Sequence, residues 1–176
     1  TEHPANDWEP RIAIDEGGKA HIVWDTYRNG NYDIYLRTYQ DGQLGPLVAV
    51  ADTPRFEAHA SIAIDGQSRV WVAWAEAGPN WAKDFGPTID PDWRESSFQD
   101  RLGHSPGLPV YDFRTLNLVV LEGDLRKTPM GSFHPLDAAK GDSYDYPQLL
   151  VDRPSGRVGL LFHRRGHTGA TRRGRV

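Results

Sequence analysis

The stretch that decides the fold is Ile12-Ala13-Ile14-Asp15, which is followed nine positions later by Trp24. The same pattern returns fifty positions further on as Ile62-Ala63-Ile64-Asp65 with Trp74. An internal repeat of this period is typical of solenoids, propellers and arrays. Because the repeat unit here consists of short alternating segments, the pattern predicts a β-propeller.

Each repeat is built from short strands separated by tight turns. In the first repeat, alternating apolar and polar residues predict strands at residues 11–15, 20–25, 32–39 and 46–50. Turn signals such as Asp41-Gly42 separate these strands, because Asp hydrogen-bonds the nearby backbone and Gly adopts positive φ. The second repeat supplies residues 62–65, 70–74 and 114–122, and a looser third repeat supplies 148–152 and 158–162. No segment has a sustained helical period, so we expect an all-β protein.

We expect one partial propeller of four-stranded antiparallel blades spanning residues 1–176. Its parts are a blade at 8–54, a blade at 55–133 with an inserted loop at 75–113, a partial blade at 146–162 and a basic tail at 163–176, with residues 126–145 as an irregular link. Propellers close with roughly four to eight blades. About two and a half blades therefore indicate a fragment, or a protein that obtains further blades from elsewhere, with one apolar sheet face exposed.

One aromatic position recurs in all three repeats. In each repeat an aromatic residue ends the apolar stretch of the second strand. These residues are Trp24, Trp74 and Phe162. We expect these rings to pack between neighbouring sheets.

Composition and charge exclude several classes of protein. The sequence has no cysteine, so disulfides and thiolate metal sites are absent. The net charge is −4, but residues 163–176 carry five arginines and no acid, so the body of the chain is distinctly acidic. An acidic body argues against nucleic-acid binding. The apolar runs are far shorter than the roughly 20 residues of a membrane helix, so we expect no membrane span.

The repeat resembles a known family. The pattern P-x-I-A-I-D-x-x-G-x-x-x-I-V-W from Pro10, then G-N-Y-D-I-Y-L-R from Gly30, then Asp41-Gly42, resembles the blades of bacterial propellers of the sialidase and Asp-box superfamily. Of that family's Ser-x-Asp-x-Gly-x-Thr-Trp box, the segment 39–44 keeps Asp-Gly. The resemblance covers residues 8–74 and, more loosely, 114–125 and 146–162. It implies a propeller in a secreted (extracellular) or periplasmic bacterial protein.

The inserted loop at 75–113 holds one group of candidate site residues. Aromatic faces pack on sugar C–H surfaces and polar side chains bind hydroxyls, so we predict glycan contacts from Asn80, Trp81, Lys83, Trp93 and Arg101. The alternative is that the tryptophans anchor the loop to the blade.

Carboxylates in and beside this loop suggest two further roles. Glu76 and Asp84 are the candidate catalytic pair, because glycosidases use two carboxylates. Asp90 and Asp92 could supply oxygen ligands for Ca²⁺, although a solvated acidic turn is the favoured interpretation. The histidines lack HxH or HExxH spacing, so we expect no zinc site and no cofactor.

The starts of the inner strands hold a second group of candidates. Glu9, His59 and Tyr146 occupy equivalent repeat positions, each one residue before Pro10, Ala60 and Pro147. Asp25, Ala75 and His163 are also equivalent to one another. In a propeller such positions surround the mouth of the central channel, so we assign ligand binding to Glu9, Arg11, Asp25 and His59. By the resemblance, Arg11 lies near the place of one arginine of a sialidase triad. The alternative is a polar rim that faces water.

These observations favour a binding or scaffold module that recognises a glycan or a protein partner through its loop-rich face. One alternative is a glycoside hydrolase acting through Glu76 and Asp84. Another is a structural propeller attached to a catalytic domain outside this chain.

Overall fold

The computed structural model describes residues 3–78, 114–123, 126–133 and 142–165, and all regular elements in these ranges are β-strands. Sheet 1 contains β1 (Asp7–Ile14), β2 (Ala20–Thr26), β3 (Asp33–Gln40) and β4 (Gln43–Ala51). Sheet 2 contains β5 (Phe56–Ile64), β6 (Val70–Ala77), β7 (Thr115–Glu122) and β8 (Arg126–Phe133). Sheet 3 contains β9 (Ser143–Asp152) and β10 (Arg157–Arg165). No helix long and apolar enough to cross a membrane is found in these ranges.

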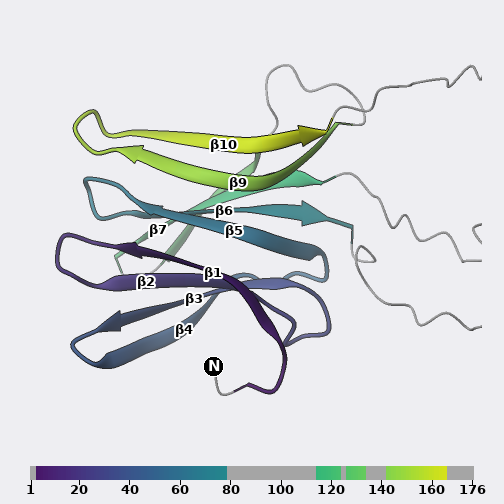
Figure 1. Ribbon diagram of the computed structural model, residues 1–176, viewed down its shortest axis with the longest axis horizontal. Coiled ribbons are helices and arrows are strands. Elements are labelled where there is room, and N and C mark those ends of the chain that lie inside the picture. The colour runs from purple at the N-terminus through teal and green to yellow at the C-terminus, as the bar shows by residue number, and fades with distance from the viewer. Residues whose placement is uncertain (1–2, 79–113, 124–125, 134–141, 166–176) are drawn as a thin grey trace, which may run out of the picture.

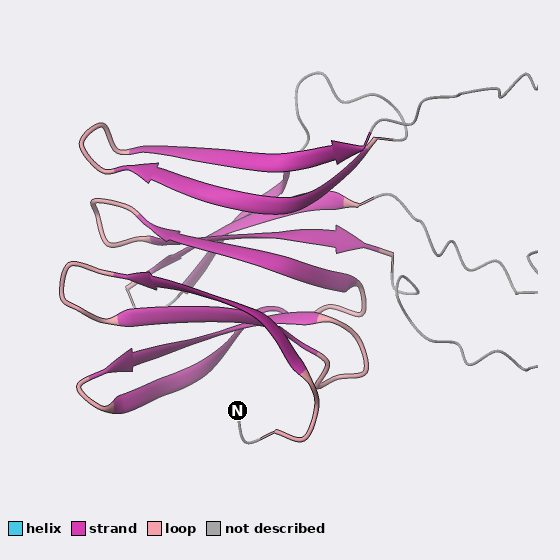
Figure 2. Ribbon diagram, viewed as in Figure 1, coloured by secondary structure: helices cyan, strands magenta, loops and turns pink. Residues whose placement is uncertain are grey.

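The sheets are antiparallel, and their strands follow chain order. They stack as three successive layers, with sheet 2 between the other two (Figure 1). The turns that join β1 to β2, β5 to β6 and β9 to β10 lie at the same edge of the stack (Figure 2). The prediction of an all-β, antiparallel fold is therefore confirmed. Within the described residues the three sheets remain separate layers and do not close into a ring.

Sheet 2 buries both of its faces. Strand β5 contacts β1, β2 and β3, and strand β9 contacts β5, β6 and β7. On the side of sheet 1, Val23 and Leu36 pack with Ile64 and Val72. On the side of sheet 3, a smaller cluster contains Ala75, Leu116, Tyr144, Leu160 and Phe162. Successive strand residues point to opposite faces, which is why one strand can serve both layers.

Within the part of the chain that the structure describes, the other face of sheet 1 is uncovered. Its exposed large apolar side chains are Ile12, Ile14, Tyr39, Leu44 and Leu47. They share one face because Ile14 pairs with Ala20, Ala20 with Tyr39, and Tyr39 with Leu44 across the sheet. The described residues of sheet 1 thus carry an exposed apolar face.

The three equivalent aromatic residues have different surroundings. Trp74 and Phe162 lie in the clusters between sheets, as predicted. Trp24 is also buried, but no other sheet among the described residues packs on the face it occupies. Its ring lies 6.5 Å from that of Tyr35, and its Nε1 donates to Asp7 Oδ1 at 3.1 Å. Packing between sheets is therefore wrong for Trp24, which is covered by its own sheet and by the residues before it.

The aspartate that ends each Ile-Ala-Ile-Asp stretch closes a hairpin. Asp65 accepts hydrogen bonds from Gln67 N at 2.9 Å, Arg69 N at 3.0 Å and Trp71 Nε1 at 2.8 Å, and it pairs with Arg69 Nε at 2.7 Å. Burial alone would raise the pKa of Asp65, but these donors outweigh burial and lower it. Asp15 accepts from Lys19 N at 2.9 Å in the same way. The recurring Asp is therefore a turn residue.

Several predicted boundaries are wrong. The segment predicted as an irregular link at 126–145 contains β8, which pairs with β7 and completes sheet 2, and the first residues of β9. Pro129 obscured β8, although proline is tolerated at the edge of a sheet. Residues 75–77, assigned to the inserted loop, continue β6, and residues 163–165, assigned to the tail, continue β10. Pairing with a neighbouring strand extends each of these elements beyond its alternating stretch.

Candidate binding site

The same bulge lies near the start of the first strand of every sheet, in β1, β5 and β9. Glu9, His59 and Tyr146 have φ values of 46°, 59° and 49°. The strand register shifts beside each of them, between Trp8 and Arg11, between Ala58 and Ser61, and opposite Tyr146. A residue with a Cβ in the left-handed region is disfavoured by roughly 1–2 kcal/mol. Three side chains at equivalent positions are thus held in an uncommon conformation.

Asp25 connects the bulge of sheet 2 to sheet 1. This residue lies near the end of β2 and is buried. One carboxylate oxygen accepts a hydrogen bond from His59 N at 2.8 Å, and the other accepts one from Ala60 N at 3.4 Å. Burial raises the pKa of Asp25 to about 6, although the two backbone donors oppose the shift. The carboxylate therefore holds the backbone on which His59 is presented.

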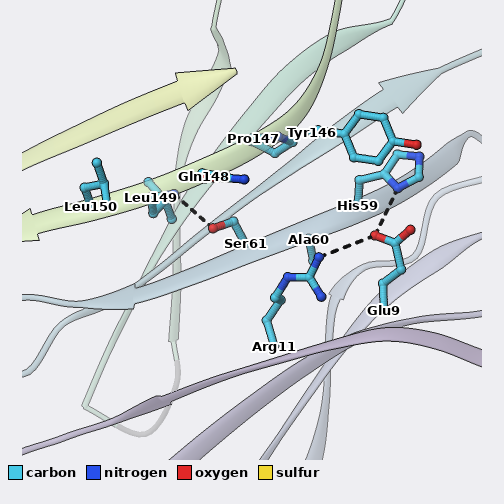
Figure 3. Close-up of a pocket in the computed structure, with 10 residues that line it drawn as sticks. All are labelled: Glu9, Arg11, His59, Ala60, Ser61, Tyr146, Pro147, Gln148, Leu149 and Leu150. Atoms are coloured by element: carbon cyan, nitrogen blue, oxygen red, sulfur yellow. Dashed lines mark hydrogen bonds and ion pairs between the residues drawn. The ribbon is translucent and has the colours of Figure 1, made fainter. Parts of the chain in front are cut away.

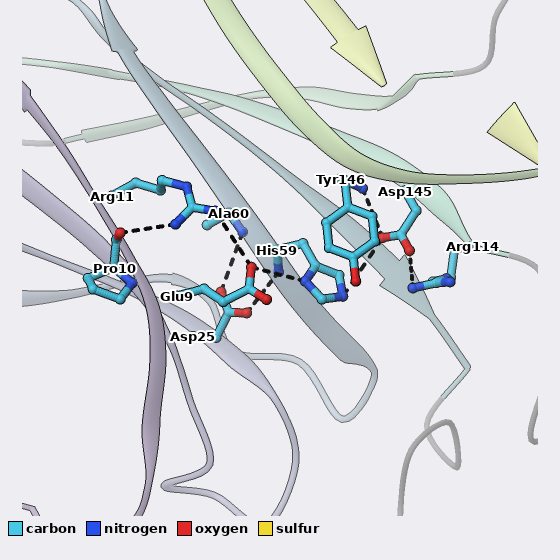
Figure 4. Close-up of polar contacts among 9 residues, drawn as sticks. All are labelled: Glu9, Pro10, Arg11, Asp25, His59, Ala60, Arg114, Asp145 and Tyr146. Atoms are coloured by element: carbon cyan, nitrogen blue, oxygen red, sulfur yellow. Dashed lines mark hydrogen bonds and ion pairs between the residues drawn. The ribbon is translucent and has the colours of Figure 1, made fainter. Parts of the chain in front are cut away.

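His59 lies at the centre of a polar network (Figure 4). Its Nδ1 donates to Glu9 Oε2 at 3.2 Å, and its Nε2 lies 3.9 Å from Asp145 Oδ1. Asp145 forms an ion pair with Arg114 and accepts from Tyr146 N at 2.9 Å. The rings of His59 and Tyr146 lie 4.2 Å apart. The network joins all three sheets.

A pocket of about 250 Å³ opens beside this network (Figure 3). Its polar lining comes from the bulge residues and from the residues two positions after each of them. These are Glu9 and Arg11, His59 and Ser61, and Tyr146 and Gln148. Ala60, Pro147, Leu149 and Leu150 complete the wall. The pocket thus combines a carboxylate, a guanidinium, an amide and an aromatic ring with an apolar side.

Three side chains of the pocket and its supporting network could hold a metal ion. In the part of the chain that the structure describes, one such group is found, with ligand atoms of Glu9, Asp25 and His59 within 4.8 Å of one another. However, both oxygens of Asp25 accept backbone hydrogen bonds, and Glu9 accepts from His59. These hydrogen bonds account for the arrangement without an ion. The proposed Ca²⁺ ligands Asp90 and Asp92 lie outside the described residues.

The predicted site residues fall into three groups. Glu9, Arg11 and His59 line the pocket, and Asp25 supports it from within. Glu76, a predicted catalytic residue, does not line the pocket: its carboxylate pairs with Arg55 Nε at 2.6 Å and accepts from Asn117 Nδ2 at 2.7 Å. The remaining candidates lie outside the described residues. These are Asn80, Trp81, Lys83, Asp84, Trp93 and Arg101.

Some residues of the pocket and of the polar network beside it were not predicted from the sequence. Ser61 and Gln148 occupy the repeat position of Arg11, so the repeat itself could have identified them. Arg114 and Asp145 have no such signal. Arg114 follows the inserted segment, and Trp8 and Ala58 stand at the positions equivalent to Asp145. Their contribution depends on how sheet 3 packs against sheet 2.

A second buried acidic group lies away from the pocket, where sheet 1 meets sheet 2. Glu57 is fully buried and accepts hydrogen bonds from Thr53 N at 3.2 Å and from Thr53 Oγ1. Nearby, Asp33 accepts from Asn31 Nδ2 at 2.6 Å. Burial raises the pKa of Glu57 to about 7, the Thr53 donors oppose the shift, and Asp33 and Glu76 add to it. The folded chain therefore holds the proton of Glu57 more tightly than a solvated glutamate does.

No protein-family model matches the chain, and no curated protein is significantly similar to it. The function of the chain is therefore inferred from its repeat and from the geometry of the pocket.

Proposed function

We propose that the chain is a binding module made of consecutive propeller blades, and that it binds a glycan in the pocket at the starts of β1, β5 and β9. Support for the propeller comes from the repeat of one sheet design and from its face-to-face stacking in chain order. In a propeller the first strand of each blade faces the central channel. The pocket would then lie at the mouth of that channel.

The observation that carries the proposal is the convergence of Glu9, His59 and Tyr146 on one pocket. Backbone strain in non-glycine residues persists where the surrounding structure enforces it, and such residues cluster at ligand sites. A bulge that was needed for chain geometry alone could use glycine, which adopts positive φ without strain. Here three different functional side chains occupy the position.

The chemistry of the lining suits a polyhydroxylated ligand. Glu9 accepts hydrogen bonds from hydroxyl groups, whereas Arg11 and Gln148 can donate to them. Tyr146 is 44% exposed, so its ring is available to pack on a sugar C–H surface. At about 250 Å³ the pocket is slightly smaller than a typical ligand site of roughly 300–1,000 Å³. We therefore propose recognition of one sugar ring, such as a terminal residue of a glycan, by a secreted or periplasmic bacterial protein.

The test is a glycan array followed by calorimetry on the best ligand. Tyr146→Ala and Gln148→Ala should each weaken binding about tenfold or more, equivalent to about 1.4 kcal/mol. Tyr39→Ala is the matched control, because Tyr39 is exposed to a similar extent but lies outside the pocket. Failure of every glycan to bind, or equal binding by Tyr146→Ala, would overturn the proposal. Chromatography of the recovered ligand would reveal hydrolysis if the module is an enzyme.

A further inference from the structure

The uncovered face of sheet 1 is equivalent to a covered face of sheet 2. Ile14 and Ile64 hold the same repeat position, yet Ile14 is 55% exposed and Ile64 is 5% exposed. Ile64 is buried because it packs with Val23 and other residues of sheet 1. The same sequence pattern therefore places isoleucine at equivalent points of two sheets, and the structure reveals what covers one of them.

The opposite end of the stack carries the complementary surface. Sheet 3 directs Leu149 and Leu160 towards sheet 2, so that Leu150 and Leu161, on the alternate positions, are exposed. Leu161 pairs with Gln148, two residues from Leu150, which places both leucines on one face. In the repeat, Leu150 and Leu161 correspond to Ala13 and Val23. Ala13 and Val23 are part of the surface of sheet 1 that packs on sheet 2.

We propose that two copies of this chain associate head to tail, with Ile12 and Ile14 of one copy packed on Leu150 and Leu161 of the other. The contact would continue the established contact between sheets 1 and 2, in which β5 packs on β1 and β2. The inference rests on the proposed propeller architecture. The chain itself carries both halves of the contact, which is why the second copy is the occupant we choose.

Two copies can form this contact twice around a two-fold axis. The result is a closed ring of six sheets, which is within the range of roughly four to eight blades known for propellers. An unclosed head-to-tail contact would instead produce filaments. In the ring, the bulge residues of both copies would face one central channel, so that two glycan pockets lie around the same axis.

The experiment measures the molar mass of the 176-residue chain in solution. Size-exclusion chromatography with light scattering gives this mass over a range of protein concentrations. The unmodified chain should form dimers. Ile14→Asp and Leu161→Asp each introduce a charge into one half of the contact, and each should yield monomers. Leu44→Asp is the matched control: Leu44 is as exposed as Leu161 but lies on β4, the strand of sheet 1 farthest from β1, so the dimer should persist.

Mixing the two variants tests the head-to-tail geometry. A pair formed from one Ile14→Asp copy and one Leu161→Asp copy keeps one unmodified contact. In that contact, Leu161 of the Ile14→Asp copy packs on Ile14 of the Leu161→Asp copy. The mixture should therefore recover dimers that neither variant forms alone. Monomers at every concentration, filaments, or a dimer that survives Leu161→Asp would overturn the inference. Circular dichroism of each variant identifies loss of fold. Leu161→Lys replaces Leu161→Asp, and Ile12→Asp replaces Ile14→Asp, where the first choice does not fold.

The outcome is separable from the proposed function. A monomer that binds glycan through Tyr146 would overturn the dimer and leave the function in place. A dimer that binds no glycan would overturn the proposed function and leave the dimer in place.

Discussion

His59 Nδ1 lies 3.2 Å from Glu9 Oε2, although the two residues are fifty positions apart in the sequence. They occupy the same place in successive repeats, and both have left-handed backbones. Each sheet therefore presents its bulge residue to that of the next sheet. The contact is a direct consequence of stacking copies of one sheet design.

This conformation predicts an unusual response to glycine. Glu9→Gly should be more stable than Glu9→Ala by about 1 kcal/mol, because both variants lose the side chain but glycine adopts positive φ without strain. Urea denaturation of the two variants measures the difference. At Arg11, a nearby exposed strand position, glycine should be less stable than alanine by roughly 0.5–1 kcal/mol. The same order at both positions would contradict the strain that we assign to Glu9.

The repeat made a large part of this site predictable. The alignment of the repeats groups Glu9 with His59 and Tyr146 from the sequence alone, since equal repeat positions lie in register when sheets stack. The bulge itself was not predictable, because Glu and Tyr rarely adopt positive φ, and a single histidine, which adopts it more often, does not identify a bulge. The role of Asp25 was not predictable either, since its partners are backbone N–H groups of the next sheet.

Pairing between strands explains the errors at element boundaries. Residues 126–133 contain proline and glycine and lack a clear alternation, yet they form β8 because β7 offers an unpaired edge. Residues 56–61 precede the Ile62-Ala63-Ile64 pattern, yet they extend β5 because β6 continues beside them. The local alternation of apolar and polar residues does not predict these strand extensions. They arise from hydrogen bonds to segments that are distant in the sequence.

The equivalent residues Ile14 and Ile64 provide a matched test of layer packing. Ile64→Ala should lower the free energy of unfolding by about 2–4 kcal/mol, because it leaves a cavity between sheets 1 and 2. Ile14→Ala should change it by less than about 0.5 kcal/mol in the monomer, since Ile14 faces solvent. Urea denaturation at low protein concentration measures both values. Equal losses for the two variants would contradict the stacking order described for these sheets.

Glu57 predicts a pH dependence of stability. Its pKa in the folded chain is raised to about 7 from an ordinary value of 4.5, so the folded state holds the proton more tightly. The associated stability is fully present below pH 4.5 and is lost as the pH rises through about 7, by roughly 3 kcal/mol at most. Glu57→Gln mimics the protonated acid and keeps contacts with Thr53, so its loss over this range should be smaller. Urea denaturation from pH 4.5 to 8 measures both profiles, and parallel profiles would contradict the assignment.

Asp65 predicts the opposite dependence, because its donors lower its pKa in the folded chain. Its stabilising effect is present above the ordinary value of 3.8 and is lost as the pH falls through the lower folded value. At pH 7, Asp65→Asn should cost about 2–3 kcal/mol, since an amide nitrogen cannot accept from Arg69 Nε or Trp71 Nε1. Asp152→Asn, at the exposed equivalent turn, should cost less than about 1 kcal/mol. Urea denaturation at pH 7 and pH 3 should show the difference between Asp65→Asn and the unmodified chain shrinking in acid, and a constant difference would assign the effect to packing instead.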